Sequence, residues 1–143
     1  PTFYKRIAKD PRATDAVDQD AAIRSIDAAA AAGVERYVMV SWIGSRADHG
    51  VEPTSSFHPY AEAKWHADEH LAASDLDWTI LGPGTLTLDP PTGRIRLDPE
   101  GRGEVPRADV AAVIAAAIDD DSTIGRTIRF GGGDEVIGHA IAG

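Results

Sequence analysis

The stretch VERYVMVS, from Val34 to Ser41, decides the fold class. Its apolar residues are mostly β-branched and have no helical spacing, which predicts a buried strand, most naturally in a parallel sheet. A helical pattern from Asp15 to Ala32 precedes it, and Gly33 is a typical stop signal at the end of a helix. A helix that leads directly into a buried strand indicates an α/β protein.

The same alternation continues along the rest of the chain. The patterns predict a helix from His58 to about Ser74, a strand at Asp77–Leu81 stopped by GPG, a short strand around Arg94–Leu97, a helix in PRADVAAVIAAAI and a strand at Gly125–Phe130. Alternating helices and strands imply βαβ crossovers and a doubly wound, Rossmann-like parallel sheet. We expect a single domain over residues 15–143, preceded by an arm or loop at residues 1–14.

Composition excludes several classes of partner. The net charge of −9 argues against nucleic acid and anionic membranes, because both attract clustered Lys and Arg. The sequence contains no run of about 18 apolar residues, so we expect no membrane span. The chain has no cysteine, which excludes disulfides and thiol chemistry. With no leader sequence visible, we expect a cytoplasmic protein.

The segment HPYAEAKWHADEHL, from His58 to Leu71, contains the main candidate for catalysis. Tyr60 and Lys64 are four residues apart, so on a helix both side chains point to the same side. A nearby ammonium group favours the phenolate form of a tyrosine and lowers its pKa. Such a tyrosine can act as a general acid toward a carbonyl or as a general base toward an alcohol.

The same segment permits a second interpretation, as a zinc site. His66, Glu69 and His70 spell H-x-x-E-H, in which two histidines one helical turn apart can share a metal ion. However, the surrounding residues are polar and typical of a solvated helix face, and none of the other histidines stands in a recognisable spacing. The sequence therefore predicts no functional metal site.

Several segments, in order, resemble the C-terminal half of the short-chain dehydrogenase/reductase superfamily. The similarity is greatest to its atypical, NAD(P)H-binding NmrA-like branch. VDQDAAIRSIDAAAAAGVERYVMVS resembles the helix that leads into the family's AGVxRFVxVSS, and the YAEAK helix follows. LDWTILGPG is similar to LDYTIVRPG, while GEVPRADVAAVIAAAID and IGRTIRFGGGD resemble the last helix and strand. The resemblance implies a Rossmann-like fold that binds NADP or NAD.

This resemblance also implies roles for individual residues. Tyr60 would be the proton donor, Lys64 would tune its pKa and bind the nicotinamide ribose, and Ser41 would orient the substrate oxygen. All three would also contact the cofactor, together with Pro83 and Gly84 beside the nicotinamide. Trp42, which replaces the family's second serine, would line the substrate pocket.

Two further departures from the family matter. Asp18 stands where relatives have an asparagine, and Leu81-Gly82 replaces the usual Val-Arg. No G-x-x-G-x-x-G turn for the pyrophosphate is present, so the N-terminal cofactor-binding βαβ half is expected to be missing. Three alternatives stay open: the sequence is a fragment, it pairs with a second chain that provides this half, or it has lost cofactor binding.

These observations leave two kinds of function open. One is the reduction of a carbonyl or quinone-type small molecule by NAD(P)H. The alternative is a redox sensor or regulator that binds NADP(H) without turnover. The resemblance also implies a homodimer by analogy, and it identifies neither the substrate nor the preference for NADP over NAD.

Overall fold

The computed structural model describes residues 11–143, with side chains described from Gln19 onward. The chain forms two compact units, which are described separately below. The first unit contains the residues up to Val34 together with Ser45–Asp75, and the second contains Glu35–Gly44 together with Leu76–Gly143.

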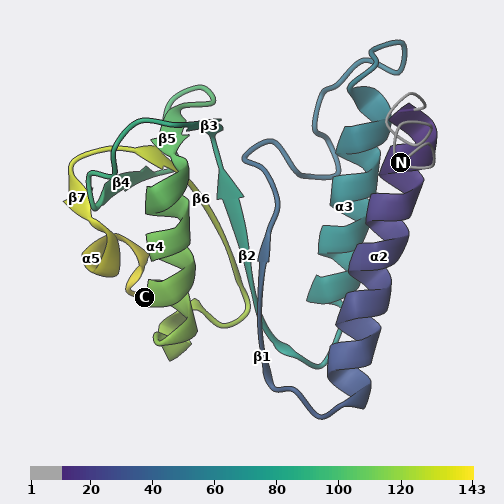
Figure 1. Cartoon of the computed structure of the whole chain (residues 1–143), viewed down its shortest axis with the longest axis horizontal. Helices are drawn as coiled ribbons and strands as arrows, with labels where there is room; N and C mark the ends of the chain where they lie inside the picture. The colour runs from purple at the N-terminus through teal and green to yellow at the C-terminus, as the bar shows by residue number, and fades with distance from the viewer. Residues whose placement is uncertain (1–10) are drawn as a thin grey trace. The chain divides into compact units, whose positions relative to one another are not determined.

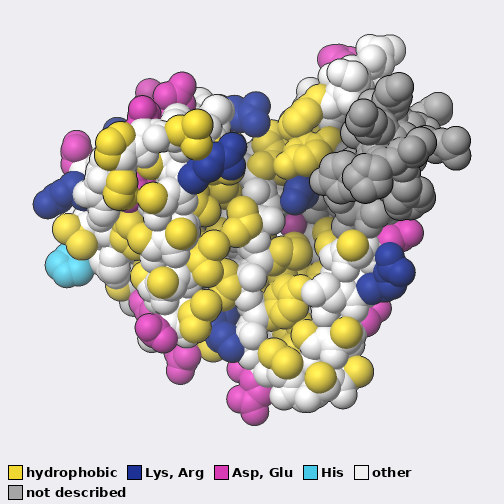
Figure 2. All heavy atoms as spheres, in the orientation of Figure 1, with side chains coloured by type: hydrophobic (Ala, Val, Ile, Leu, Met, Phe, Trp, Pro, Cys, Tyr) yellow, Lys and Arg dark blue, Asp and Glu magenta, His cyan; other side chains and the backbone are white. Residues whose placement is uncertain are grey.

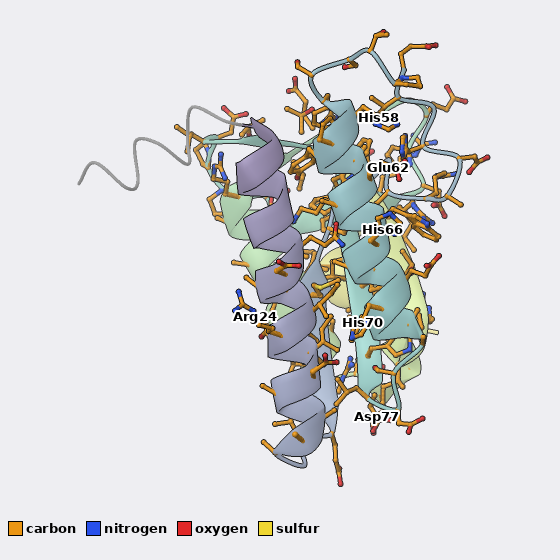
Figure 3. The ribbon with its side chains drawn as sticks, turned by 90° about the vertical axis from the view of Figure 1, so that its right-hand side faces the viewer. Arg24, His58, Glu62, His66, His70 and Asp77 are labelled. Atoms are coloured by element: carbon orange, nitrogen blue, oxygen red, sulfur yellow. The ribbon has the colours of Figure 1, made fainter. Side chains whose placement is uncertain are left out.

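Two helices make up most of the first unit. Helix α2 spans Pro11–Ala31 and helix α3 spans His58–Ala72. They lie side by side and run in the same direction (Figures 1 and 3). Ile26 of α2 and Leu71 of α3 are fully buried. Helix α3 has Pro59 in its first turn, where the missing N–H of proline leaves no hydrogen bond unmade.

A five-stranded sheet forms the centre of the second unit. Strands β1 (Arg36–Val40), β2 (Asp77–Pro83) and β6 (Arg126–Gly132) are parallel neighbours, whereas β4 (Arg94–Leu97) and β7 (Glu135–Val136) continue the sheet in antiparallel pairing. A separate parallel pair joins β3 (Thr85–Thr87) to β5 (Glu104–Pro106). The sheet is therefore mixed, with a parallel core.

Helices pack against this sheet and complete its hydrophobic core (Figure 1). Helix α4 spans Arg107–Ile118, a short 3₁₀ helix follows at Asp121–Thr123, and α5 spans Ile137–Ile141. Val113 of α4 and Phe130 of β6 are fully buried in the same cluster. Alanines and Ile118 leave the outer side of α4 largely apolar (Figure 2).

The Rossmann-like fold class predicted from the sequence is confirmed. The predicted strand at Arg94–Leu97 has the observed bounds, and the helix predicted from His58 begins there. Residues 11–14, which were expected in an arm, lie in α2, and residues 1–10 fall outside the described part of the chain. Strand β2 continues through Gly82 and Pro83 beyond its predicted end, because both residues stay in register with β6.

Some features of the fold were not predicted. Strand β1 is half-buried along its length instead of buried, since it is the outermost strand of the sheet and pairs only with β2 among the described strands. Strands β3, β5 and β7 and helix α5 also have no counterpart in the prediction, because elements this short show no periodicity. No helix among the described residues is long and apolar enough to cross a membrane.

Candidate functional site

The carboxyl ends of β1 and β2 bring several predicted site residues together in the second unit. Hydrogen bonding between the two chain segments continues past the end of β1. The Ser41 amide donates to the Leu81 carbonyl at 2.7 Å, and the Ile43 amide donates to the Pro83 carbonyl at 2.9 Å. Ser41 is 7% exposed. Ser41 and Pro83 therefore lie on adjacent strand ends, the edge at which open parallel sheets bind ligands.

Gly84 follows Pro83 directly, and the atoms around it leave no space for a side chain. Its amide donates to the Phe130 carbonyl at 2.9 Å. A Cβ atom at this position would lie 2.3 Å from the carbonyl oxygen of Arg102 and 2.6 Å from that of Gly103. Packing against this neighbouring segment therefore accounts for the glycine without reference to a cofactor.

Trp42 lies at the same edge of the sheet and packs on two sides. Its ring occupies the space that a side chain at Gly44 would need, since a Cβ there would lie 2.1 Å from the ring. The guanidinium carbon of Arg102 lies 5.5 Å from the centroid of the ring, within the range of a cation–π interaction. The Trp42 ring and the Arg102 guanidinium therefore place an aromatic surface and a positive charge next to Ser41.

Tyr60 and Lys64 lie in the first unit, one turn apart on α3. The Lys64 Nζ atom is 5.7 Å from the centroid of the Tyr60 ring, and the Phe57 ring packs on the tyrosine with a centroid distance of 4.9 Å. Both residues are half-buried. The predicted site residues therefore form two sets, Tyr60 with Lys64 in one unit and the strand-end residues in the other. The side chain of Asp18 lies outside the described part of the chain.

A cluster of histidines around Glu62 was missed by the sequence analysis. His49 Nε2 lies 2.7 Å from Glu62 Oε1, and His58 Nε2 lies 3.6 Å from the same oxygen. His66 Nε2 lies 3.5 Å from Glu62 Oε2. The spacing of His58, Glu62 and His66, four residues apart in each step, could have indicated a shared helix face. Nothing in the sequence placed His49 beside them.

The H-x-x-E-H pattern does not form a shared ligand set in the described part of the chain. His66 faces Glu62, whereas His70 Nε2 lies 2.7 Å from Asp27 Oδ1 on α2. The two histidines also line an open groove with Gln19 and Ile23 of α2. Among the described residues, His66 and His70 are therefore not part of a group of three ligands that could hold a metal ion.

The histidines also affect the charge of Glu62. The hydrogen bond from His49 lowers the pKa of the carboxyl group, with smaller contributions from the charges of His49, His58 and His66, while desolvation opposes the change. The glutamate is therefore ionised at neutral pH and offers two carboxylate oxygens to its surroundings.

Comparison with known proteins shows which protein family this chain belongs to. The NAD(P)H-binding family matches residues 7–121 of the chain. An uncharacterised sugar epimerase, YhfK of Bacillus subtilis, is 37% identical over 126 residues, covering 87% of this chain and 58% of that protein. A putative NAD-dependent epimerase/dehydratase from Bacillus halodurans superimposes with a TM-score of 0.77 at 36% identity, covering 84% of this chain and 56% of the other.

A second similar structure is ChuY from Escherichia coli O157:H7, described as an anaerobillin reductase. It has a TM-score of 0.70 and 29% identity, over 80% of this chain and 58% of that one. The chain therefore belongs to the NAD(P)H-binding family, as an atypical member of the short-chain dehydrogenases/reductases, and this match supports NAD(P) binding. It spans a little over half the length of these relatives.

Proposed function

We propose that this chain provides the nicotinamide and substrate side of an NAD(P)H-dependent oxidoreductase that reduces a carbonyl or quinone-type small molecule. The observation that carries this proposal is the pairing of Tyr60 with Lys64 on α3, in a chain of an NAD(P)H-binding family. The description of the similar ChuY protein as a reductase supports it.

The residues present suit one half of the cofactor. Lys64 offers an ammonium to the nicotinamide ribose, and the strand ends at Ser41 and Pro83 offer the edge of a parallel sheet, where ligands of such folds bind. NAD(P)H, when bound, supplies the hydride. The pyrophosphate would need backbone amides at a helix N-terminus, which another part of the protein or a second chain would provide.

In this proposal the protein moves one proton and orients one oxygen. Tyr60 would donate its phenolic proton to the substrate oxygen, and the Lys64 ammonium would stabilise the phenolate left behind. The Ser41 hydroxyl donates a hydrogen bond to the same oxygen. Trp42 lines the substrate pocket, and its indole favours a flat, conjugated substrate over a small aliphatic one.

Replacement of Tyr60 tests the proposal, with the protein produced from its complete reading frame and assayed for NADPH oxidation with quinones and aromatic aldehydes. Tyr60→Phe should lower kcat by on the order of 10²–10⁴-fold while the variant still binds NADPH. Unchanged turnover would contradict the assigned role of Tyr60. NADPH binding without turnover in the parent protein would instead favour the redox-sensor alternative.

A further inference from the structure

We propose that His49, His58 and Glu62 bind a zinc ion that fastens the loop after β1 to helix α3. Their ligand atoms, one from each side chain, all lie within 4.8 Å of one another. Two imidazole nitrogens and a carboxylate oxygen form a donor set that zinc commonly uses, with water in the fourth position. The proposal is independent of the reductase function.

The distances from Glu62 to the two histidines approach those of a zinc site, and the ligand atoms of His49 and His58 lie within 4.8 Å of each other. Zinc–nitrogen bonds of about 2.0–2.1 Å place neighbouring ligands of a tetrahedral site roughly 3.3 Å apart. His58 Nε2 is 3.6 Å from Glu62 Oε1, while His49 Nε2 is 2.7 Å from the same oxygen. Binding therefore requires Glu62 and His49 to separate by about 0.6 Å. The Glu62 side chain is 41% exposed and has room for this movement.

Burial and anchoring distinguish this cluster from an accidental surface group. The His49 side chain is 5% exposed although it comes from a loop. The same loop is held independently at Ser45, whose hydroxyl donates to Asp68 Oδ2 of α3 at 2.6 Å. The Ser45–Asp68 hydrogen bond therefore holds the start of this loop against α3, and His49 follows four residues later. His58 and Glu62 lie one turn apart on α3 (Figure 3).

The position on the helix shows what the metal would do. His58 and Glu62 lie on one side of α3, and Tyr60 and Lys64 are displaced from them by roughly half a turn. A zinc ion on the side opposite the tyrosine would not touch the proposed reacting atoms. The ion would link the loop to the helix and would keep a water molecule as its fourth ligand.

Metal binding also requires a change in the His49 ring. The Val51 amide donates to His49 Nδ1 at 3.0 Å, so the ring proton resides on Nε2 and is donated to Glu62. Zinc on Nε2 moves this proton to Nδ1, and the Val51 amide must turn away. Gly50, with a φ of 74° and no atom within 4 Å of its Cβ position, leaves the loop space for this movement.

Zinc titration in competition with a chelator tests the proposal on the full protein. We expect one equivalent of zinc to bind, and His49→Gln and Glu62→Gln each to weaken binding on the order of 100-fold. The matched controls are His70→Gln and His139→Gln, which remove histidines outside the cluster and should leave the affinity unchanged.

A second readout covers the case in which a variant folds poorly. Nitrogen NMR of the parent protein should show the His49 proton on Nε2 without zinc and on Nδ1 with it. Binding that His49→Gln leaves unaffected, or a His49 tautomer that zinc does not change, would overturn the proposal and indicate chelation by exposed histidines. The absence of stoichiometric binding would overturn it as well.

Discussion

Lys64 places its ammonium nitrogen 5.7 Å from the centre of the Tyr60 ring on the same side of helix α3. The pair lies within one compact unit, and its spacing is set by the helix itself. A cation held near a phenol favours the transfer of its proton, and this is the physical basis of the proposed chemistry.

Removal of that cation should slow the reaction without removing the proton donor. We expect Lys64→Met to lower kcat on the order of 10²-fold, because the phenolate formed during proton transfer loses its stabilising charge. Lys64→Arg should retain part of the rate, since it keeps the positive charge. Steady-state kinetics with NADPH checks both variants, and equal rates for Met and Lys at this position would contradict the role of the charge.

Gly84 should tolerate no side chain. We expect Gly84→Ala to lower the free energy of unfolding by about 2–3 kcal/mol, because the new Cβ would overlap the carbonyl oxygen of Arg102. Gly138→Ala is the matched control: no atom lies within 4 Å of its Cβ position in α5, so it should raise the stability by about 0.4–1 kcal/mol. Urea denaturation measures both changes, and equal effects would refute the packing argument.

Arg36 joins three elements at the opposite end of β1. Its guanidinium donates to Thr79 Oγ1 at 2.9 Å, to the Ala117 carbonyl at 2.8 Å and to Thr123 Oγ1 at 2.7 Å. We expect Arg36→Met to lower the free energy of unfolding by about 3 kcal/mol, since buried acceptors lose a charged donor.

The control for the Arg36→Met variant is the same change at Arg24, which makes few contacts. Arg24 is exposed and donates only to the Asp20 carbonyl at 3.3 Å among its described hydrogen bonds. Arg24→Met should change the stability by no more than about 0.5 kcal/mol. Thermal denaturation followed by circular dichroism compares the two variants, and similar melting temperatures would show that the Arg36 contacts contribute nothing.

Asp109 should matter more as a hydrogen-bond acceptor than as a charge near a helix start. It is fully buried, and its two carboxylate oxygens accept from the backbone amides of Thr92 and Gly93. Asp109→Asn replaces one acceptor by a donor and should lower the stability by about 1–3 kcal/mol. The exposed Asp119→Asn should have almost no effect, and a denaturant titration distinguishes the two outcomes.

The contact of Glu62 with His49 should make stability depend on pH in the acid range. The hydrogen bond lowers the pKa of Glu62 in the folded protein, so its contribution is present above the ordinary value of about 4.5 and is lost as the pH falls through the folded pKa. The stability difference between the parent protein and Glu62→Gln should therefore shrink below about pH 4.5. Urea denaturation of both proteins at several pH values measures this difference, and a difference that stays constant across the acid range would contradict the prediction.

Periodicity in the sequence accounts for what could be predicted. Helix α3 and its Tyr60–Lys64 pair follow from spacing along one helix, and the order of helices and strands gave the fold class. The contact between His49 and Glu62 has no such signature, because it joins an irregular loop to a helix. Likewise, the requirement for Gly84 depends on the carbonyl of Arg102, which the intervening turns bring close only in the folded chain.

Cofactor titration tests the central claim most directly. NADPH added to the protein produced from its complete reading frame should quench tryptophan fluorescence saturably. Trp42→Phe should remove much of that quenching, since this indole lies beside Ser41 at the proposed nicotinamide edge. A saturable signal that depends on Trp42 is the predicted result. No saturable change in the parent protein would contradict the assignment of this edge to NAD(P)H.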